Sequence, residues 1–214
     1  MHLPDGILPL PVTLGGYVAS FAIAAVCVGR IRALPDPQRE VPRAALMTAA
    51  FFVASLIHFP VPPVSVHLVL NGLLGVVLGW FAFPAILVGL FLQAVMFGHG
   101  GITTLGINGL ILGLPALAAF GLFRFRARFP VLLRHRPTLV IAFLAGAVGV
   151  GVALLLFAFT LLGSLPVHIN AELERKALLT LVLAHIPVVV LEGVLTALLV
   201  GFFLKVSPGL LEGR

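Results

Sequence analysis

Apolar residues gather in seven runs along the chain, separated by short polar or proline-containing stretches. The runs cover residues 12–29, 44–58, 64–80, 84–97, 102–122, 138–163 and 177–204. No Lys or Arg lies within any of them, and Glu192 is the one acidic residue that does. Runs of this kind are typical of membrane-spanning helices. The pattern predicts an all-α integral membrane protein, with seven transmembrane helices in a single membrane domain over residues 1–214.

The second, third and fourth runs are shorter than the roughly 20 residues that a straight span needs. Their helices either continue into the flanking residues or stop short of a full crossing to shape a cavity, as broken helices do in transporters. Length alone does not separate these two interpretations.

Composition supports the membrane class. Hydrophobic residues make up 61% of the chain and charged residues 9%, unlike a soluble domain. The net charge of +6 does not indicate nucleic-acid binding, because the basic residues lie between the apolar runs. A single cysteine, Cys27, excludes an internal disulfide and a Cys-rich metal site. No G-x-x-x-x-G-K-[ST] motif is present, so ATP hydrolysis would belong to another chain.

The basic residues also predict the orientation. If the N-terminus is outside, eleven of the 13 Lys and Arg residues fall on the cytoplasmic side, and the C-terminus is cytoplasmic as well. Six histidines then lie in the outer half of the membrane, namely His2, His58, His67, His99, His168 and His185. Neutral imidazole is the commonest metal ligand in proteins. We therefore predict a metal site that opens to the outside.

The first two residues offer a metal three nitrogen donors: the α-amine of Met1, the amide nitrogen of His2 after loss of its proton, and the His2 imidazole. These donors close fused chelate rings of five and six atoms in one plane, an arrangement that nickel(II) and copper(II) favour. The segment lacks the basic region of a signal peptide. The alternative interpretation is a polar residue at a frayed terminus.

Further polar residues sit at the ends of the apolar runs. His58 and His67 bracket a proline-rich loop. His67 opens a helical span, and Asn71 follows it at i+4 on the same helix face. Gln93 precedes the glycine-rich segment around His99 and Asn108, where glycines allow close backbone approach. Interfacial histidines and small residues also serve ordinary helix packing.

In the last run, His185 and Glu192 are seven residues apart and therefore share a helix face. A carboxylate inside a span indicates a functional site or a tie between helices. Two alternatives stay open at this point. One is a proton-coupled secondary transporter with these two residues as a relay, and the other is a non-transport membrane subunit or an intramembrane hydrolase around Ser164 and His185.

Three motifs resemble one family. They are Met1–Gly6 (MHLPDG), Phe97–Gly106 (FGHGGITTLG) and Ala184–Pro187 (AHIP), the last followed by Glu192-Gly193. Together they are similar to the CbiM and NikM proteins, the substrate-binding membrane components of cobalt/nickel transporters of the energy-coupling-factor type. The motifs spread over nearly the whole chain.

The resemblance implies a seven-helix bundle in the cytoplasmic membrane of a bacterium or archaeon, with the N-terminus inserted into the bundle from outside. It implies that Ni²⁺ or Co²⁺ is the transported substrate, held in a square plane by the Met1 amine, the His2 amide nitrogen and imidazole, and His67. Supporting residues are expected among Asp5, His58, Asn71, Gln93, His99, Asn108, His185 and Glu192.

The resemblance also implies partners rather than an enzymatic activity of this chain. The expected partners are a membrane coupling component, cytoplasmic ATPases and, in some relatives, a small extra membrane subunit. The chain itself is expected to lie in the lipid bilayer and to bind no nucleic acid. A planar four-nitrogen site suits nickel best. Family members of both selectivities share the pattern, so nickel and cobalt both stay open.

Overall fold

The computed structural model describes residues 2–61, 64–164 and 171–211. Within them lie seven α-helices: α1 Leu10–Arg32, α2 Val41–Leu56, α3 Asn71–Leu78, α4 Ala82–Phe97, α5 Leu105–Phe125, α6 His135–Ser164 and α7 Ala171–Val206. Short 3₁₀ turns occupy Gln38–Glu40, Gly79–Phe81, Arg126–Arg128, Pro130–Leu133 and Pro208–Leu210. Two strands, β1 His58–Val61 and β2 Val64–His67, pair antiparallel, with His58 opposite His67.

In the part of the chain that the structure describes, five helical stretches are long and apolar enough to cross a membrane: Leu10–Arg32, Asn71–Phe97, Leu105–Arg128, His135–Ser164 and Leu179–Val206. The chain is therefore a helical, multi-pass membrane protein. Helix α2 has 16 residues and α3 has only 8, about 12 Å at 1.5 Å per residue. The stretch Asn71–Phe97 is interrupted at Gly79, whose φ of 59° is readily adopted by glycine.

One expected helix differs from the structure. The apolar run 64–80 was expected to be helical throughout, but its first four residues form β2 and the helix starts at Asn71. Two physical causes are visible in the sequence. Prolines at 60, 62 and 63 break a helix ahead of this run, and the alternating β-branched pattern of Val64-Ser65-Val66 suits a pleated strand.

The short helix α3 is the centre of the bundle. Every one of its residues is buried, and it packs against α5, α6, α4 and α7. Gly75 shows how closely the helices approach, because a Cβ at this position would lie 2.0 Å from the carbonyl oxygen of Ala116 in α5. Only glycine fits there.

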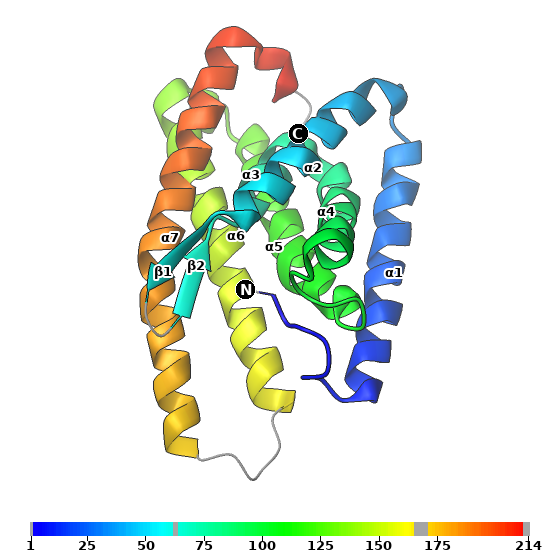
Figure 1. Ribbon diagram of the computed structural model, residues 1–214. Helices are drawn as coiled ribbons and strands as arrows, with labels where there is room; N and C mark the ends of the chain where they lie inside the picture. Colours follow the sequence, from blue (N-terminus) through cyan, green and yellow to red (C-terminus); the bar gives the residue numbers. More distant parts are fainter. Residues whose placement is uncertain (1, 62–63, 165–170, 212–214) are drawn as a thin grey trace.

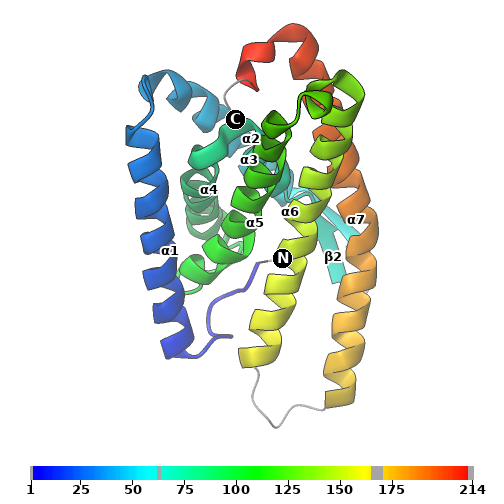
Figure 2. The same ribbon diagram turned by 180° about the vertical axis from the view of Figure 1, so that it is seen from behind.

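The N-terminal segment runs from the start of α1 into the middle of the bundle, where it approaches α5 and the hairpin side of the molecule (Figure 1). Seen from behind, the same segment lies between α1 and α6, and β2 lies beside α7 (Figure 2). The C-terminal ends of α1 and α7 lie at the same end of the molecule (Figure 1). This arrangement brings the chain's first residues beside segments that are about 65 to 105 residues away in sequence.

Candidate metal centre

Three imidazoles from distant parts of the chain converge inside the bundle. His2 belongs to the N-terminal segment, His67 ends β2, and His99 lies in the loop between α4 and α5. One ring nitrogen of each lies within 4.8 Å of the others. His99 Nε2 is 3.0 Å from His2 Nδ1, and the ring centroids of His2 and His67 are 5.1 Å apart. Nitrogen ligands at this spacing are suited to a first-row transition metal.

Helix α5 fixes the position of His2 through the next residue, Leu3. The Leu3 N–H donates to Asn108 Oδ1 at 2.9 Å, and the Leu3 carbonyl accepts from Asn108 Nδ2 at 3.0 Å and from the Thr104 hydroxyl at 2.6 Å. Leu3 itself is 1% exposed. Both backbone polar groups of Leu3 are thus held by side chains of, or directly before, α5. Asn108 acts on the backbone beside His2.

Asp5 fastens the same segment to the loop that carries His99. Its carboxylate accepts hydrogen bonds from the Thr103 hydroxyl at 2.5 Å and from the backbone N–H groups of Thr103 and Ile102 at 2.8 and 3.3 Å. These bonds, the hydroxyl bond foremost, lower the pKa of Asp5 below its usual 3.8. A Cβ at Gly101 would lie 2.2 Å from Asp5 Oδ1, so the loop approaches the carboxylate at a glycine.

His67 has a defined tautomer. Its Nδ1 lies 2.9 Å from the carbonyl oxygen of Leu68. Because a carbonyl only accepts, this contact selects the ring form with the proton on Nδ1 and the lone pair on Nε2. A hydrogen bond from the far ring nitrogen is the usual way in which proteins orient a metal-binding histidine. His67 is 3% exposed, whereas His2 and His99 are half-buried.

Glu192 of α7 holds the segment that joins His67 to α3. Its carboxylate accepts hydrogen bonds from the N–H of Val69 and, at 2.8 and 3.0 Å, from the N–H of Leu70. Leu70 has a φ of 52°, the one positive φ among the non-glycine residues that the structure describes. The glutamate is fully buried. The acidic residue of the last span therefore stabilises a left-handed turn three residues after His67.

Asn71 does not occupy the place that the sequence suggested. It was expected on a helix face shared with His67, but His67 ends a strand and Asn71 begins α3. Its amide donates to the carbonyls of Gly149 at 2.9 Å and Leu112 at 3.3 Å. Asn71 thus ties α3 to α6 and α5. The i+4 argument was wrong because residues 64–67 are extended.

The remaining predicted residues lie around the cluster in different ways. Gln93 donates from its amide to the Ser55 hydroxyl and joins α4 to α2. His185 is buried in α7, with Nδ1 2.8 Å from the Leu181 carbonyl oxygen. His58 starts β1 opposite His67 in the strand register, and its side chain lies outside the described residues, as do Met1 and His168.

Sequence reasoning overlooked Thr104 as a supporting residue. Its hydroxyl is buried and bonded to the Leu3 carbonyl. The available signal was its spacing from Asn108, because residues four apart share a helix face and Asn108 was already a candidate. Asn108 Nδ2 indeed lies 3.3 Å from the Thr104 hydroxyl.

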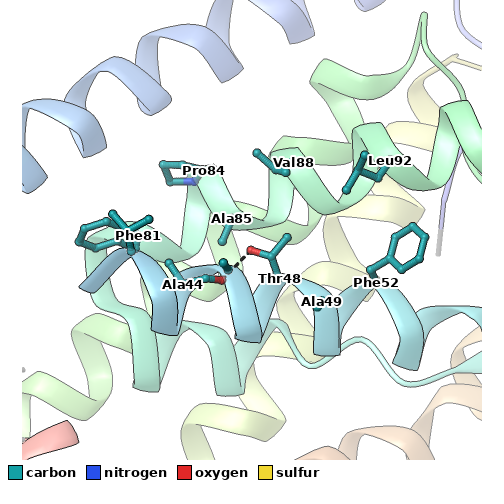
Figure 3. A pocket seen from close by; sticks show the side chains of 11 residues that line it. Ala44, Thr48, Ala49, Phe52, Phe81, Pro84, Ala85, Val88 and Leu92 are labelled. Carbon is teal, nitrogen blue, oxygen red and sulfur yellow. Dashed lines mark hydrogen bonds between the residues drawn. The ribbon is translucent and has the colours of Figure 1, made fainter. Parts of the chain in front are cut away.

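An apolar groove of about 530 Å³ lies between α2 and α4 and is separate from the histidines (Figure 3). Its walls are aliphatic and aromatic side chains, with Thr48 as the polar exception, and the Thr48 hydroxyl donates to the Ala44 carbonyl of its own helix at 2.8 Å. No His, Cys, Asp or Glu lines this groove. It supplies no metal ligands.

A helical membrane bundle with three imidazoles gathered around an inserted N-terminal segment defines a membrane protein that handles a transition metal. The chain belongs to the CbiM family: the profile of the cobalt uptake substrate-specific transmembrane region matches residues 2–210. The resemblance seen in the motifs is confirmed. The protein is a membrane component of cobalt or nickel uptake.

Individual relatives agree with this assignment. A Haemophilus influenzae protein, provisionally named a metal transport protein, is 38% identical over 97% of this chain and 95% of its own length. The fused nickel transport protein NikMN of Rhodobacter capsulatus is 31% identical over 100% of this chain, which spans 65% of that longer protein. The crystal structure of a truncated transition metal transporter matches with a TM-score of 0.80 at 25% identity, over 96% of this chain and 99% of that one.

Proposed function

We propose that this protein is the substrate-binding component of an energy-coupling-factor type importer for Ni²⁺, with Co²⁺ as the second candidate. The observation that carries the proposal is the convergence of His2 and His67 beside Leu3, whose backbone N–H and carbonyl are both held by Asn108 of α5. A metal site built on the chain's first residues requires that segment to be immobilised, and these contacts immobilise it.

In the proposed metal-bound state, the metal lies in a square plane of four nitrogens. The Met1 amine, the His2 amide nitrogen and the His2 imidazole form the chelate, and His67 completes the plane. His67 supports this role because its Nδ1 contact to the Leu68 carbonyl places the lone pair on Nε2. Binding releases protons, because the amine and the amide must both lose one.

The supporting residues act at two levels in this proposal. Asp5 and Asn108 hold the backbone around His2, and Glu192 holds the segment after His67, as their hydrogen bonds indicate. Asn71, Gln93 and His185 contribute to the scaffold through their own contacts with neighbouring helices or backbone. His58 and His99 are the remaining candidates for direct influence on the metal.

We further propose that residues 1–214 form one membrane domain of seven helical segments in the bacterial or archaeal cytoplasmic membrane, with the N-terminus outside and the C-terminus inside. The short helix α3 crosses only part of the bilayer. Arginines at one end of the bundle favour this orientation. Arg30 lies 5.6 Å from the Trp80 ring centroid, and Arg124 lies 5.9 Å from that of Phe120. Aromatic rings and basic residues of this kind are typical of a cytoplasmic membrane interface.

ATP hydrolysis and coupling belong to separate chains in this proposal: a membrane coupling component, cytoplasmic ATPases and a small additional membrane subunit. The fused NikMN relative is longer than this chain, as expected if its second part corresponds to such a subunit. Helix α1 exposes the small residues Gly15, Ala22 and Ala25 on its outer side, which suits close contact with a partner helix.

The central experiment tests the Met1 amine. Protein is produced with peptide deformylase inhibited, so that a formyl group, only one carbon and one oxygen, remains on Met1 and removes the amine's basicity. Half of the same preparation is then deformylated enzymatically. We expect planar low-spin Ni²⁺, seen by its visible d–d absorption, only in the deformylated half.

Two outcomes would contradict the proposed site. Identical nickel spectra and affinities in both halves would remove the Met1 amine as a ligand. A His67→Ala protein that keeps full nickel affinity would remove His67, with His135→Ala as the matched control, because His135 begins α6, away from the cluster.

A further inference from the structure

We infer that His99 is a direct metal ligand in a separate capture state, in which the imidazoles of His2, His67 and His99 hold the incoming ion before the Met1 amine and the His2 amide nitrogen do. This inference rests on the proposed planar site only for what happens after capture. The capture state itself depends on the three imidazoles that the structure brings together.

The spacing of the rings fits shared coordination. A metal that binds two imidazoles at 2.0–2.1 Å and at angles between 90° and 109° places their nitrogens about 2.8–3.4 Å apart. His99 Nε2 and His2 Nδ1 are 3.0 Å apart. The third nitrogen, from His67, lies within 4.8 Å of both. A shift of the His67 nitrogen by at most about 2 Å completes a three-nitrogen site.

His99 faces the atom of His2 that the planar chelate also needs. The six-membered chelate ring runs from the metal through the His2 amide nitrogen, Cα, Cβ and Cγ to Nδ1, so Nδ1 is the imidazole donor in that state. The same Nδ1 is the partner of His99 Nε2 in the structure. His99 and the Met1–His2 chelate therefore engage the metal in sequence, with His2 Nδ1 and His67 common to both states.

The transfer balances in bonds and protons. The metal gains bonds to the Met1 amine and the His2 amide nitrogen. It gives up its bond to His99 Nε2 and its bond to the water that fills the fourth position of the tetrahedral capture state. The amide proton of His2 leaves to water, together with the proton of the amine where that was charged. Three neutral imidazoles, by contrast, bind a metal without any loss of an amide proton.

This difference gives the two states different selectivity. A three-imidazole site suits Co²⁺ and Zn²⁺ in tetrahedral geometry as well as Ni²⁺, whereas a planar site with an ionised amide favours Ni²⁺ and Cu²⁺. Capture is then broadly selective, and the later planar state discriminates between the ions. Zn²⁺ is expected to bind and remain in the capture state.

The backbone around His99 suits a ligand that receives the metal first. Gly98 and Gly100 flank it with φ values of 59° and 82°, and a Cβ at Gly100 would lie 3.6 Å from the His2 Cβ. This turn presents the ring to His2 at close range. His99 is half-buried and follows the exposed residues Phe97 and Gly98, while His67 is almost fully buried. His99 therefore lies on the more accessible side of the cluster.

The test uses Co²⁺ alone as the probe on the whole protein in detergent, with the formyl group retained on Met1 so that the planar state is blocked. We expect one Co²⁺ per chain with the intense d–d absorption of tetrahedral coordination. His99→Ala is expected to weaken this binding at least about tenfold, while His135→Ala leaves it unchanged. His99→Gln, which keeps a polar side chain of moderate size, serves as a second variant whose thermal unfolding reports on folding.

A kinetic arm uses the deformylated protein. His99→Ala is expected to reach the same planar nickel spectrum as the unchanged protein, but about tenfold or more slowly in stopped-flow absorption. Formylated protein without bound Co²⁺, or formylated His99→Ala and His99→Gln with undiminished Co²⁺ affinity, would overturn the inference. A deformylated protein that lacks the planar nickel spectrum while the formylated protein binds Co²⁺ would refute the proposed planar site and leave the capture state standing.

Discussion

The two sides of the histidine cluster are held by different kinds of anchor. His67 is held by what we term the Glu192 anchor, a fully buried carboxylate bonded to the N–H groups of Val69 and Leu70. His2 is held by the N-terminal anchor, formed by Asn108, Thr104 and the exposed Asp5. The first lies wholly in the protein's core, while the second combines the buried contacts of Leu3 with the exposed Asp5 and fastens a chain end to the bundle. We therefore expect loss of the Glu192 anchor to cost stability and loss of the N-terminal anchor to cost mainly metal affinity.

The largest effect is expected from Glu192→Ala. The variant leaves the N–H groups of Val69 and Leu70 buried without their acceptor, at about 1–3 kcal/mol each. We expect a loss of about 2–6 kcal/mol in unfolding free energy, measured by thermal and denaturant unfolding in detergent, with nickel binding reduced as a consequence.

Glu192→Gln is the matched control for this variant. It keeps an oxygen acceptor in a side chain of nearly the same shape, so it should retain most of the stability that the alanine variant loses. An alanine variant as stable as the unchanged protein would show that the Glu192 anchor does not hold the turn at Leu70.

A pair of asparagine variants sharpens the contrast between the anchors. Asn108 and Asn71 are both buried, but Asn108 binds the Leu3 backbone whereas Asn71 joins α3 to α5 and α6. We expect Asn108→Ala to weaken nickel binding about 10–100-fold, the usual cost of losing a group that orients a ligand. Asn71→Ala should mainly lower the thermal stability.

Isothermal titration and thermal unfolding of both variants measure these two quantities side by side. Equal effects of the two substitutions on nickel affinity at equal stability would contradict the distinction, because it would mean that Asn108 acts only as a packing residue.

The smallest effect is expected from Asp5, which is exposed. Its pKa is lower in the folded protein than the usual 3.8, so the stabilisation by the ionised carboxylate is fully present well above pH 3.8. This stabilisation is lost as the pH falls through the pKa of the folded protein. Protection of the Thr103 amide against hydrogen exchange in metal-free protein should decrease over that acidic range. Asp5→Asn should remove this dependence and weaken nickel binding at neutral pH by no more than about fivefold. Unchanged acid dependence in the variant would assign it to another group.

Much of the helical pattern could be predicted from the sequence, because long apolar runs without charges have few other stable forms in a membrane. The hairpin could not. Val64–His67 continues an apolar run, and a short run does not separate a strand from a helix by itself. The prolines before it, at 60, 62 and 63, were the local signal against a continuous helix.

The site was predictable to a similar degree. Histidine chemistry and the family motifs identified His2, His67 and His99, and their convergence depends on tertiary packing that no local pattern encodes. The partner of Glu192 was hidden for the same reason: a backbone N–H exists at nearly every residue, so nothing in the sequence marks Val69 and Leu70 as its donors. Asn71 shows the reverse case. The argument that it shares a helix face with His67 failed because residues 64–67 form a strand and not a helix.

The long-range bonds to Leu3 and Val69 also set an order of events during synthesis. The N–H of Leu3 can bond only after Asn108, 105 residues later, has been synthesised, and the N–H of Val69 only after Glu192, 123 residues later. At roughly 5–20 residues per second, the ribosome needs about 6–25 s to supply the second partner. A chain interrupted before α7 lacks the contact that shapes the turn after His67. The assembled centre thus reports that synthesis and insertion of the last helix are complete.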